Sequence, residues 1–134
     1  MNITKYKIIK MLLSKRFSLL KKSKMGNHGS NTKYVGFWKS TDGNPNDKFT
    51  EMPIENSATY DQTSIIKKIR KLEKKAHCEH YRGYSQCRLC DKYNNGSKEY
   101  SIGCFVWPEG YIHYLEEHNV AVDEKFAKYA KSRM

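Results

Sequence analysis

Two cysteines and two histidines constrain this chain more than any other feature of its sequence. Cys87 and Cys90 have two residues between them, and His113 and His118 follow after twenty-two further residues. A two-residue spacer lets both sulfurs converge on one ion, and structural zinc is held tetrahedrally by four thiolate or imidazole ligands. The pattern therefore predicts a zinc site with Cys87, Cys90, His113 and His118 as ligands, in which Zn2+ has a structural role.

The spacing of the histidines sets a condition on the local structure. Residues five apart on an ideal helix lie about 140° from each other around its axis. Both histidines can reach one metal only if the last helical turn is distorted or if His118 lies just beyond the helix end. Asn119 suits a left-handed residue after a helix, which favours the second arrangement. Without zinc, the cysteines would be small core residues and the histidines ordinary groups on a helix surface.

The size and composition of the chain favour a stabilising metal. It has 134 residues, of which 38% are hydrophobic and 29% charged, so one domain with a small core is expected. No stretch approaches the roughly 18 apolar residues of a membrane span. The first apolar run is interrupted by basic residues and does not resemble a secretory signal. Met25 is a candidate alternative start of the chain. We therefore expect an intracellular protein, cytoplasmic or, for a viral protein, in the host cytoplasm or the virion. Its four cysteines are then reduced thiols or metal ligands.

The net charge of +11 is concentrated near the N-terminus. Residues 1–41 carry nine Lys, one Arg and no acidic residue, whereas residues 77–134 carry eight basic and eight acidic residues. We therefore divide the chain into a basic amphipathic tail and linker, 1–33, and a zinc-binding α+β domain, 34–134. A helix expected over residues 1–24 would dock on the domain or bind an acidic partner such as phospholipid or nucleic acid.

Hydrophobic periodicity predicts a helix over residues 62–76. Its lysines would face water, opposite an apolar stripe. Before this helix, residues 34–38 would form a strand or an anchor on the core, and residues 41–59 an extended loop rich in turn residues. The apolar stripe of the helix predicted over residues 62–76 consists of Ile65, Ile66, Ile69 and Leu72.

The pattern of the C-terminal half predicts a small α+β zinc domain. A helix, a zinc knuckle with a β-hairpin, the ligand-bearing helix and a short C-terminal helix would follow one another along the chain. The hairpin and helices are predicted from turn residues and from the preference of proline for the first helical position. The predicted elements are two strands, 98–101 and 104–107, about a turn at Ile102-Gly103, a helix opened by Pro108 and Glu109 that runs to about Glu117, and a last helix over 123–132.

A second group of candidate ligands, His77, Cys78 and His80, lies upstream of the knuckle. They would be alternative ligands, or Cys78 would lie near Cys104. Because no second cysteine pair accompanies them, we expect an incidental cluster. Cys104 falls in a predicted strand and is interpreted as a core thiol.

Three segments, 81–90, 95–99 and 107–120, carry a resemblance to a known family. Their motif, CRxC followed by WPEGxxHYxxxH, resembles a family of small uncharacterised proteins from bacteria and large DNA viruses. The resemblance covers roughly residues 34–127, and no activity is established for the family. It implies that Glu99, Trp107, Pro108, Glu109 and Tyr114 belong to the family pattern beside the four ligands. We expect Trp107 and Tyr114 to pack around the site.

Three functions are compatible with these features. The favoured one is a non-catalytic protein-interaction module with structural zinc and a protein partner of unknown identity. An alternative is binding of nucleic acid or another polyanion through the N-terminal tail and the lysine face of residues 62–76. Residues 109–118 do not suit a helix that reads DNA, because they include three glutamates and no Lys or Arg. A metal-dependent hydrolase or nuclease would need an open zinc position, which four protein ligands do not leave.

Overall fold

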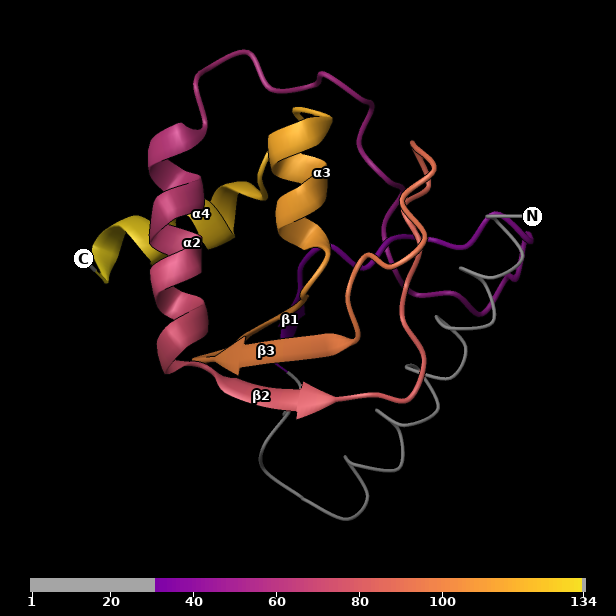
Figure 1. The fold of residues 1–134 in the computed structure, drawn as a ribbon, viewed down its shortest axis with the longest axis horizontal. Coiled ribbons are helices and arrows are strands. Elements are labelled where there is room, and N and C mark those ends of the chain that lie inside the picture. Colours follow the sequence, from indigo (N-terminus) through magenta and orange to yellow (C-terminus); the bar gives the residue numbers. More distant parts are fainter. Residues whose placement is uncertain (1–30, 134) are drawn as a thin grey trace.

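The computed structural model describes residues 31–133, and within them a four-stranded sheet and three helices form a mixed α+β fold (Figure 1). The predicted α+β class is thereby confirmed. The helix predicted over residues 1–24 lies outside the described residues, and the division of the chain after residue 33 stays a prediction. The described elements are β1 (Lys33–Tyr34), α2 (Thr63–Lys75), β2 (His77–His80), β3 (Lys98–Ile102), β4 (Phe105–Pro108), α3 (Tyr111–Glu117) and α4 (Glu124–Ser132).

The strands form one sheet in the order β1-β4-β3-β2, with β1 parallel to β4 and the other neighbours antiparallel. Tyr100 of β3 is paired with Trp107 of β4, so both side chains lie on the same face. The helices lie on one side of the sheet, with α4 behind α2 in the view of Figure 1. There Trp107 and Phe105 pack against Phe126 of α4, with ring centroids 4.8 and 5.3 Å apart. The core is therefore enclosed between the sheet and the helices.

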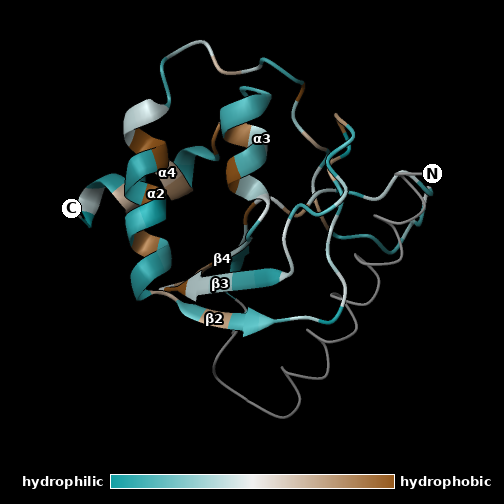
Figure 2. Ribbon diagram, viewed as in Figure 1, coloured by the Kyte–Doolittle hydropathy of each residue, from teal (hydrophilic) through white to brown (hydrophobic). Residues whose placement is uncertain are grey.

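α2 forms close to the predicted bounds because its apolar residues recur at helical spacing. Figure 2 shows them as brown bands along an otherwise hydrophilic helix. At the start of α2, Asp61 Oδ1 accepts hydrogen bonds from the backbone N–H and the hydroxyl of Thr63, at 2.9 and 2.7 Å. At its end, Ala76 adopts an extended conformation and leads directly into β2. The buried residues of α2 are Ile65, Ile66, Ile69 and Leu72, the stripe predicted from the sequence.

β3 and β4 form a hairpin whose turn lies one residue later than predicted. Ile102 is still paired with Phe105, so the turn consists of Gly103 and Cys104 rather than Ile102 and Gly103. Gly103 has a φ of 59°, a left-handed conformation that glycine adopts without strain. Because Cys104 lies in the turn, it is exposed, and its interpretation as a core thiol is wrong.

The ligand-bearing helix also begins later than predicted. Pro108 is the last residue of β4 and is paired with Glu99, and the N–H of Glu109 donates to Lys98 O at 2.9 Å. α3 therefore begins at Tyr111, and the prediction that Pro108 opens it is wrong. The fixed φ of proline is compatible with an extended strand end as well as with a helix start, and here the pairing with β3 decides between them.

The two edge strands are short. β2 (His77–His80) contains no apolar alternation and pairs with β3 along its whole length. At the other edge only Lys33 and Tyr34 are extended, while Phe37 and Trp38 are buried. The segment 34–38 thus serves mainly as an anchor on the core, the second of its two predicted roles. None of the helices in the described range is long and apolar enough to cross a membrane.

Candidate metal centre

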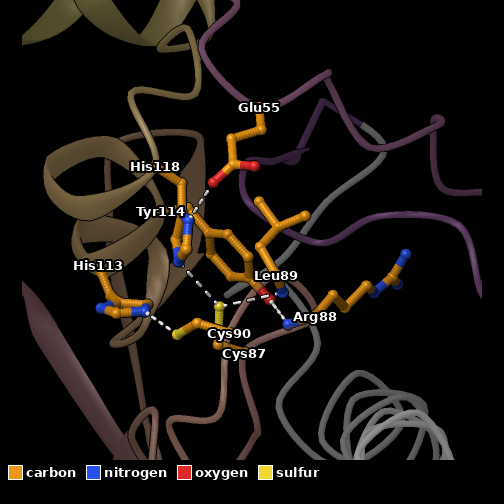
Figure 3. Close-up of polar contacts among 8 residues, drawn as sticks. All are labelled: Glu55, Cys87, Arg88, Leu89, Cys90, His113, Tyr114 and His118. Atoms are coloured by element: carbon orange, nitrogen blue, oxygen red, sulfur yellow. Dashed lines mark hydrogen bonds and ion pairs between the residues drawn. The ribbon is translucent and has the colours of Figure 1, made fainter.

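The side chains of Cys87, Cys90, His113 and His118 come together (Figure 3). The cysteines lie in the loop before β3, His113 lies in the first turn of α3, and His118 directly follows this helix. One ligand atom of each residue lies within 4.8 Å of the other three. Cys87 Sγ is 3.5 Å from His118 Nε2, and Cys90 Sγ is 3.3 Å from His113 Nε2. Among residues 31–133, this is the one such gathering of three or more Cys, His, Asp or Glu side chains.

The spacing of these atoms suits a tetrahedral zinc ion. With metal–sulfur distances of about 2.3 Å and metal–nitrogen distances of about 2.0–2.1 Å, a tetrahedron separates sulfur from nitrogen by about 3.6 Å. The two sulfur–nitrogen distances of 3.5 and 3.3 Å are close to this value. Thiolate and imidazole ligands favour zinc over magnesium or calcium, which prefer oxygen. The four side chains therefore fit zinc in both geometry and chemistry.

Backbone hydrogen bonds shape the cysteine knuckle and hold it against α3. The N–H of Leu89 donates to Cys87 Sγ at 3.3 Å, and the N–H of Cys87 donates to Lys92 O at 3.2 Å. The N–H of Arg88 donates to the hydroxyl of Tyr114 on α3 at 2.8 Å. An N–H that points at a sulfur favours the thiolate form, which is the form that binds metal.

α3 ends at the point that allows both histidines to face the knuckle. Its last residue is Glu117, and His118 is the capping residue with a φ of −119°. Asn119 follows with a φ of 46°, the left-handed conformation predicted for it. The N–H groups of His118 and Val120 both donate to Tyr114 O, at 3.3 and 3.1 Å. His118 thus leaves the helical path directly after α3, as its distance from His113 in the sequence requires.

A carboxylate from a distant loop holds the other ring nitrogen of His118. Glu55 Oε1 lies 2.6 Å from His118 Nδ1. The loop is itself attached to the end of α3, because Asn56 N–H donates to His118 O at 2.8 Å and Ala58 N–H donates to Asn119 O at 3.1 Å. Metal-binding imidazoles commonly donate their second N–H to a carboxylate, which fixes the tautomer and the ring orientation. The contact leaves Nε2 of His118 directed at the sulfurs.

The electrostatic environment distinguishes the four ligands. Burial raises the pKa of Cys87 and lowers the pKa of His113. For Cys90, burial acts to raise the pKa, but hydrogen bonds from Lys92 N–H and from His118 outweigh it, and the pKa falls below its ordinary value. For His118, burial acts to lower the pKa, but hydrogen bonds to a carboxylate and a thiol raise it. A lowered thiol pKa favours the thiolate of Cys90, which is the form that binds a metal ion.

The two aromatic residues expected around the site occupy different places. The ring of Tyr114 lies beside the centre, with its centroid 6.2 Å from that of His118. Trp107 lies in the core between sheet and helices, where its Nε1 donates to Glu73 Oε2 at 3.0 Å and its ring packs against Phe126. Trp107 therefore stabilises the packing of α2 and α4 on the sheet.

The second cysteine and histidine cluster is distributed over both faces of β2. Cys78 Sγ lies 3.8 Å from His80 Nε2, whereas His77 Nε2 lies 2.9 Å from Glu79 Oε1. Because side chains alternate along a strand, His77 and His80 point to opposite faces and cannot share one ion. In the described part of the chain these residues do not join a group of three ligands.

Comparison with known proteins does not identify this chain. No family model, no curated protein and no solved structure matches it. The resemblance to a family of small bacterial and viral proteins therefore stays a prediction.

Proposed function

We propose that the protein is a non-catalytic zinc-binding protein, that its zinc is structural, and that it acts as a protein-interaction module. The observation that carries the proposal is the convergence of Cys87, Cys90, His113 and His118 within 4.8 Å. Four protein ligands complete a tetrahedron, so a zinc ion held in this way has no position for a reacting water.

Zinc would join two parts of the chain that have different structural support. α3 is packed into the core, while the knuckle belongs to a segment between β2 and β3 that has no helix or strand of its own. Structural zinc supplies about 10 kcal/mol or more of apparent binding energy to folding. The net stability of a domain is only about 5–15 kcal/mol. Loss of zinc would therefore cost most or all of the stability of this fold.

If zinc has a structural role, the activity of the domain lies in its surface. The activity that we propose is binding of a protein partner by this surface. Ile54 supports a protein partner, because it is 81% exposed, more than any other large apolar side chain in the described residues. It directly precedes Glu55, which contacts His118. A partner that covers Ile54 would meet the loop attached to the metal centre.

The metal content of the purified protein tests the structural role of zinc. We expect mass spectrometry to find one zinc ion per chain. When a chelator removes the zinc, the circular dichroism spectrum should change from that of a folded to that of an unfolded protein. Absence of zinc, with structure retained, would reduce the cysteine and histidine pattern to coincidence. Absence of zinc from an unfolded preparation that folds when zinc is added would support the proposal as well as copurified metal does.

Cobalt substitution separates a closed structural site from an open catalytic one. Cobalt in the Cys2His2 site should show the strong visible absorption of four-coordinate geometry, and added azide or cyanide should leave the spectrum unchanged, because no coordination position is open. A shift of the spectrum by these anions would contradict the closed site and would favour the hydrolase alternative.

A further inference from the structure

The outward face of α2 is strongly cationic. Between positions 67 and 75 it carries six basic residues and a single acidic one, Glu73. Glu73 does not offset this charge on the outer face, because it is turned toward the core and accepts a hydrogen bond from Trp107 at 3.0 Å. Arg70 is neutralised by Glu116 of α3 at 2.7 Å. The remaining basic residues of α2 are Lys67, Lys68, Lys71, Lys74 and Lys75.

Three of these lysines form a row along the axis of the helix. Lys67, Lys71 and Lys74 lie opposite Ile69, which is fully buried, and all three are exposed. Their spacing of four and then three residues corresponds to about 6 and 4.5 Å along the helix axis. Within residues 31–133 none of the three forms an ion pair. The row therefore presents uncompensated charge to solvent.

α4 carries further exposed lysines. It packs against α2, and both helices lie at the same end of the molecule (Figure 1). Phe126, Ala127 and Ala130 form its buried side, and its exposed positions include Lys125, Lys128 and Lys131. Lys128 is only weakly paired, with its Nζ 3.8 Å from an oxygen of the exposed Glu124. We call the lysines of the α2 row, together with Lys125, Lys128 and Lys131, the α2–α4 surface.

We propose that the α2–α4 surface binds the phosphate backbone of duplex nucleic acid. Duplex DNA carries one negative charge per about 1.7 Å of its axis, and cationic side chains that neutralise phosphates release condensed counterions. Lysines in a row act as point charges for successive phosphates. Because the surface offers ammonium groups and no amide or bidentate side chains to base edges, its binding would be independent of sequence. This function goes beyond the structural role proposed for zinc, because none of the candidate zinc ligands takes part in it.

The composition of the surface argues against two other polyanions. A helix that lies on a membrane inserts an exposed apolar face, whereas the apolar residues of α2 are buried in the core. Proteins that hold single-stranded nucleic acid stack its bases on aromatic side chains. The exposed positions of α2 carry only Thr, Ser, Lys and Arg. Contact with the backbone of a duplex requires neither feature.

The test compares two triple variants of the full chain that change the net charge equally. The first is Lys67→Gln, Lys71→Gln and Lys74→Gln, which retains good helix formers on α2. The matched control is Lys39→Gln, Lys48→Gln and Arg82→Gln, three cations outside the helices. Affinity for a short duplex of mixed sequence is measured by fluorescence anisotropy over a series of salt concentrations, and circular dichroism verifies that both variants are folded.

We expect the plot of log association constant against log salt concentration to become shallower in the α2 variant, its slope losing about 2.7 in magnitude, because each lost phosphate contact removes about 0.9. In the control the slope should lose less than about 1 in magnitude. An unchanged slope in the α2 variant would overturn the proposal, because binding would then come from cations elsewhere in the chain. Equal losses in both variants would also overturn it, since only net charge would matter. Tighter binding of single strands or of phosphatidylserine vesicles, with the same dependence on α2, would assign the surface to a different partner.

Discussion

Glu55 Oε1 lies 2.6 Å from Nδ1 of His118, although the two residues are 63 positions apart in the chain. The His118 side chain is almost fully buried, whereas Glu55 is partly exposed. The contact places a carboxylate behind a candidate zinc ligand and attaches the loop before α2 to the end of α3. In zinc proteins such a carboxylate orients the imidazole and increases its basicity, which makes it a better ligand.

Replacement of Glu55 by alanine should therefore weaken zinc binding without abolishing it. Loss of a carboxylate that supports a zinc-bound histidine typically costs 10–100-fold in metal affinity, and we expect a loss of about this size. Competition with a chromophoric chelator measures it. Glu51→Ala is the matched control, because Glu51 is an exposed carboxylate in the same loop. Equal zinc affinities of the two variants would show that the contact with His118 has no effect on the metal.

Removal of a ligand should have a larger effect. Cys90→Ala deletes one of two sulfurs, and we expect loss of zinc and unfolding, because the remaining core cannot replace the binding energy of the metal. Metal analysis and thermal melting followed by circular dichroism provide the measurement. Cys104→Ala is the control, since Cys104 is an exposed cysteine in the β3–β4 turn. A cooperative melt of metal-free Cys90→Ala would contradict the structural role.

The sequence was sufficient to predict the parts of the centre that depend on short spacings. The pattern from Cys87 to His118 identified the four side chains that the structure brings together. Asn119 indicated where α3 would end, because few residues other than glycine adopt a positive φ readily. These features are local, so a single chain contains enough information to find them.

The parts that were missed depend on contacts between distant segments. Nothing near Glu55 marks it as a partner of His118, since only the folded chain brings the two together. β2 is a polar strand formed by pairing with β3, and periodicity alone does not indicate it. Pro108 has a conformation that suits both a helix start and a strand end, and the pairing with Glu99 selects the strand.

Gly110 supports a further prediction about the position of α3. It precedes the first residue of the helix, and a Cβ at this position would lie 2.2 Å from Asn95 O, the backbone of the segment that follows the knuckle. Gly110→Ala should therefore force the two segments apart and destabilise the protein by about 1–3 kcal/mol, the usual cost of overpacking. Denaturant unfolding of the zinc-loaded protein measures the change.

The control for this prediction is Gly43→Ala. Gly43 has open space around its Cβ position but a φ of 73°, so the variant reports backbone strain without a clash. Its expected cost is about 1–2 kcal/mol. Gly110 has an ordinary φ of −75°, so a loss there comes from the clash alone. A Gly110→Ala variant as stable as the parent protein would mean that α3 and the segment around Asn95 are not in close contact.

Glu99 introduces a dependence of stability on pH that is separate from the metal ligands. Its side chain is buried in β3, and burial raises the pKa of its carboxyl to about 8, against the effect of a hydrogen bond from the Tyr81 hydroxyl at 3.1 Å. The charge of Glu79, paired with Glu99 across the strands, also raises the pKa. Oε2 of Glu99 has no hydrogen-bond partner among the described residues. The folded protein therefore favours the neutral acid.

Because the pKa of Glu99 is higher in the folded than in the unfolded chain, the folded state holds more protons between about pH 4.5 and pH 8. Within this window the free energy of unfolding should fall by about 1.4 kcal/mol for each pH unit. Glu99→Gln keeps an acceptor for Tyr81 but cannot ionise. The difference between its free energy of unfolding and that of the parent protein should therefore grow in favour of the variant from pH 6 to pH 8. Taking this difference cancels the pH dependence of zinc binding, which both proteins share. Glu124→Gln, an exposed control, should show no such trend, and a constant difference for Glu99→Gln would contradict the raised pKa.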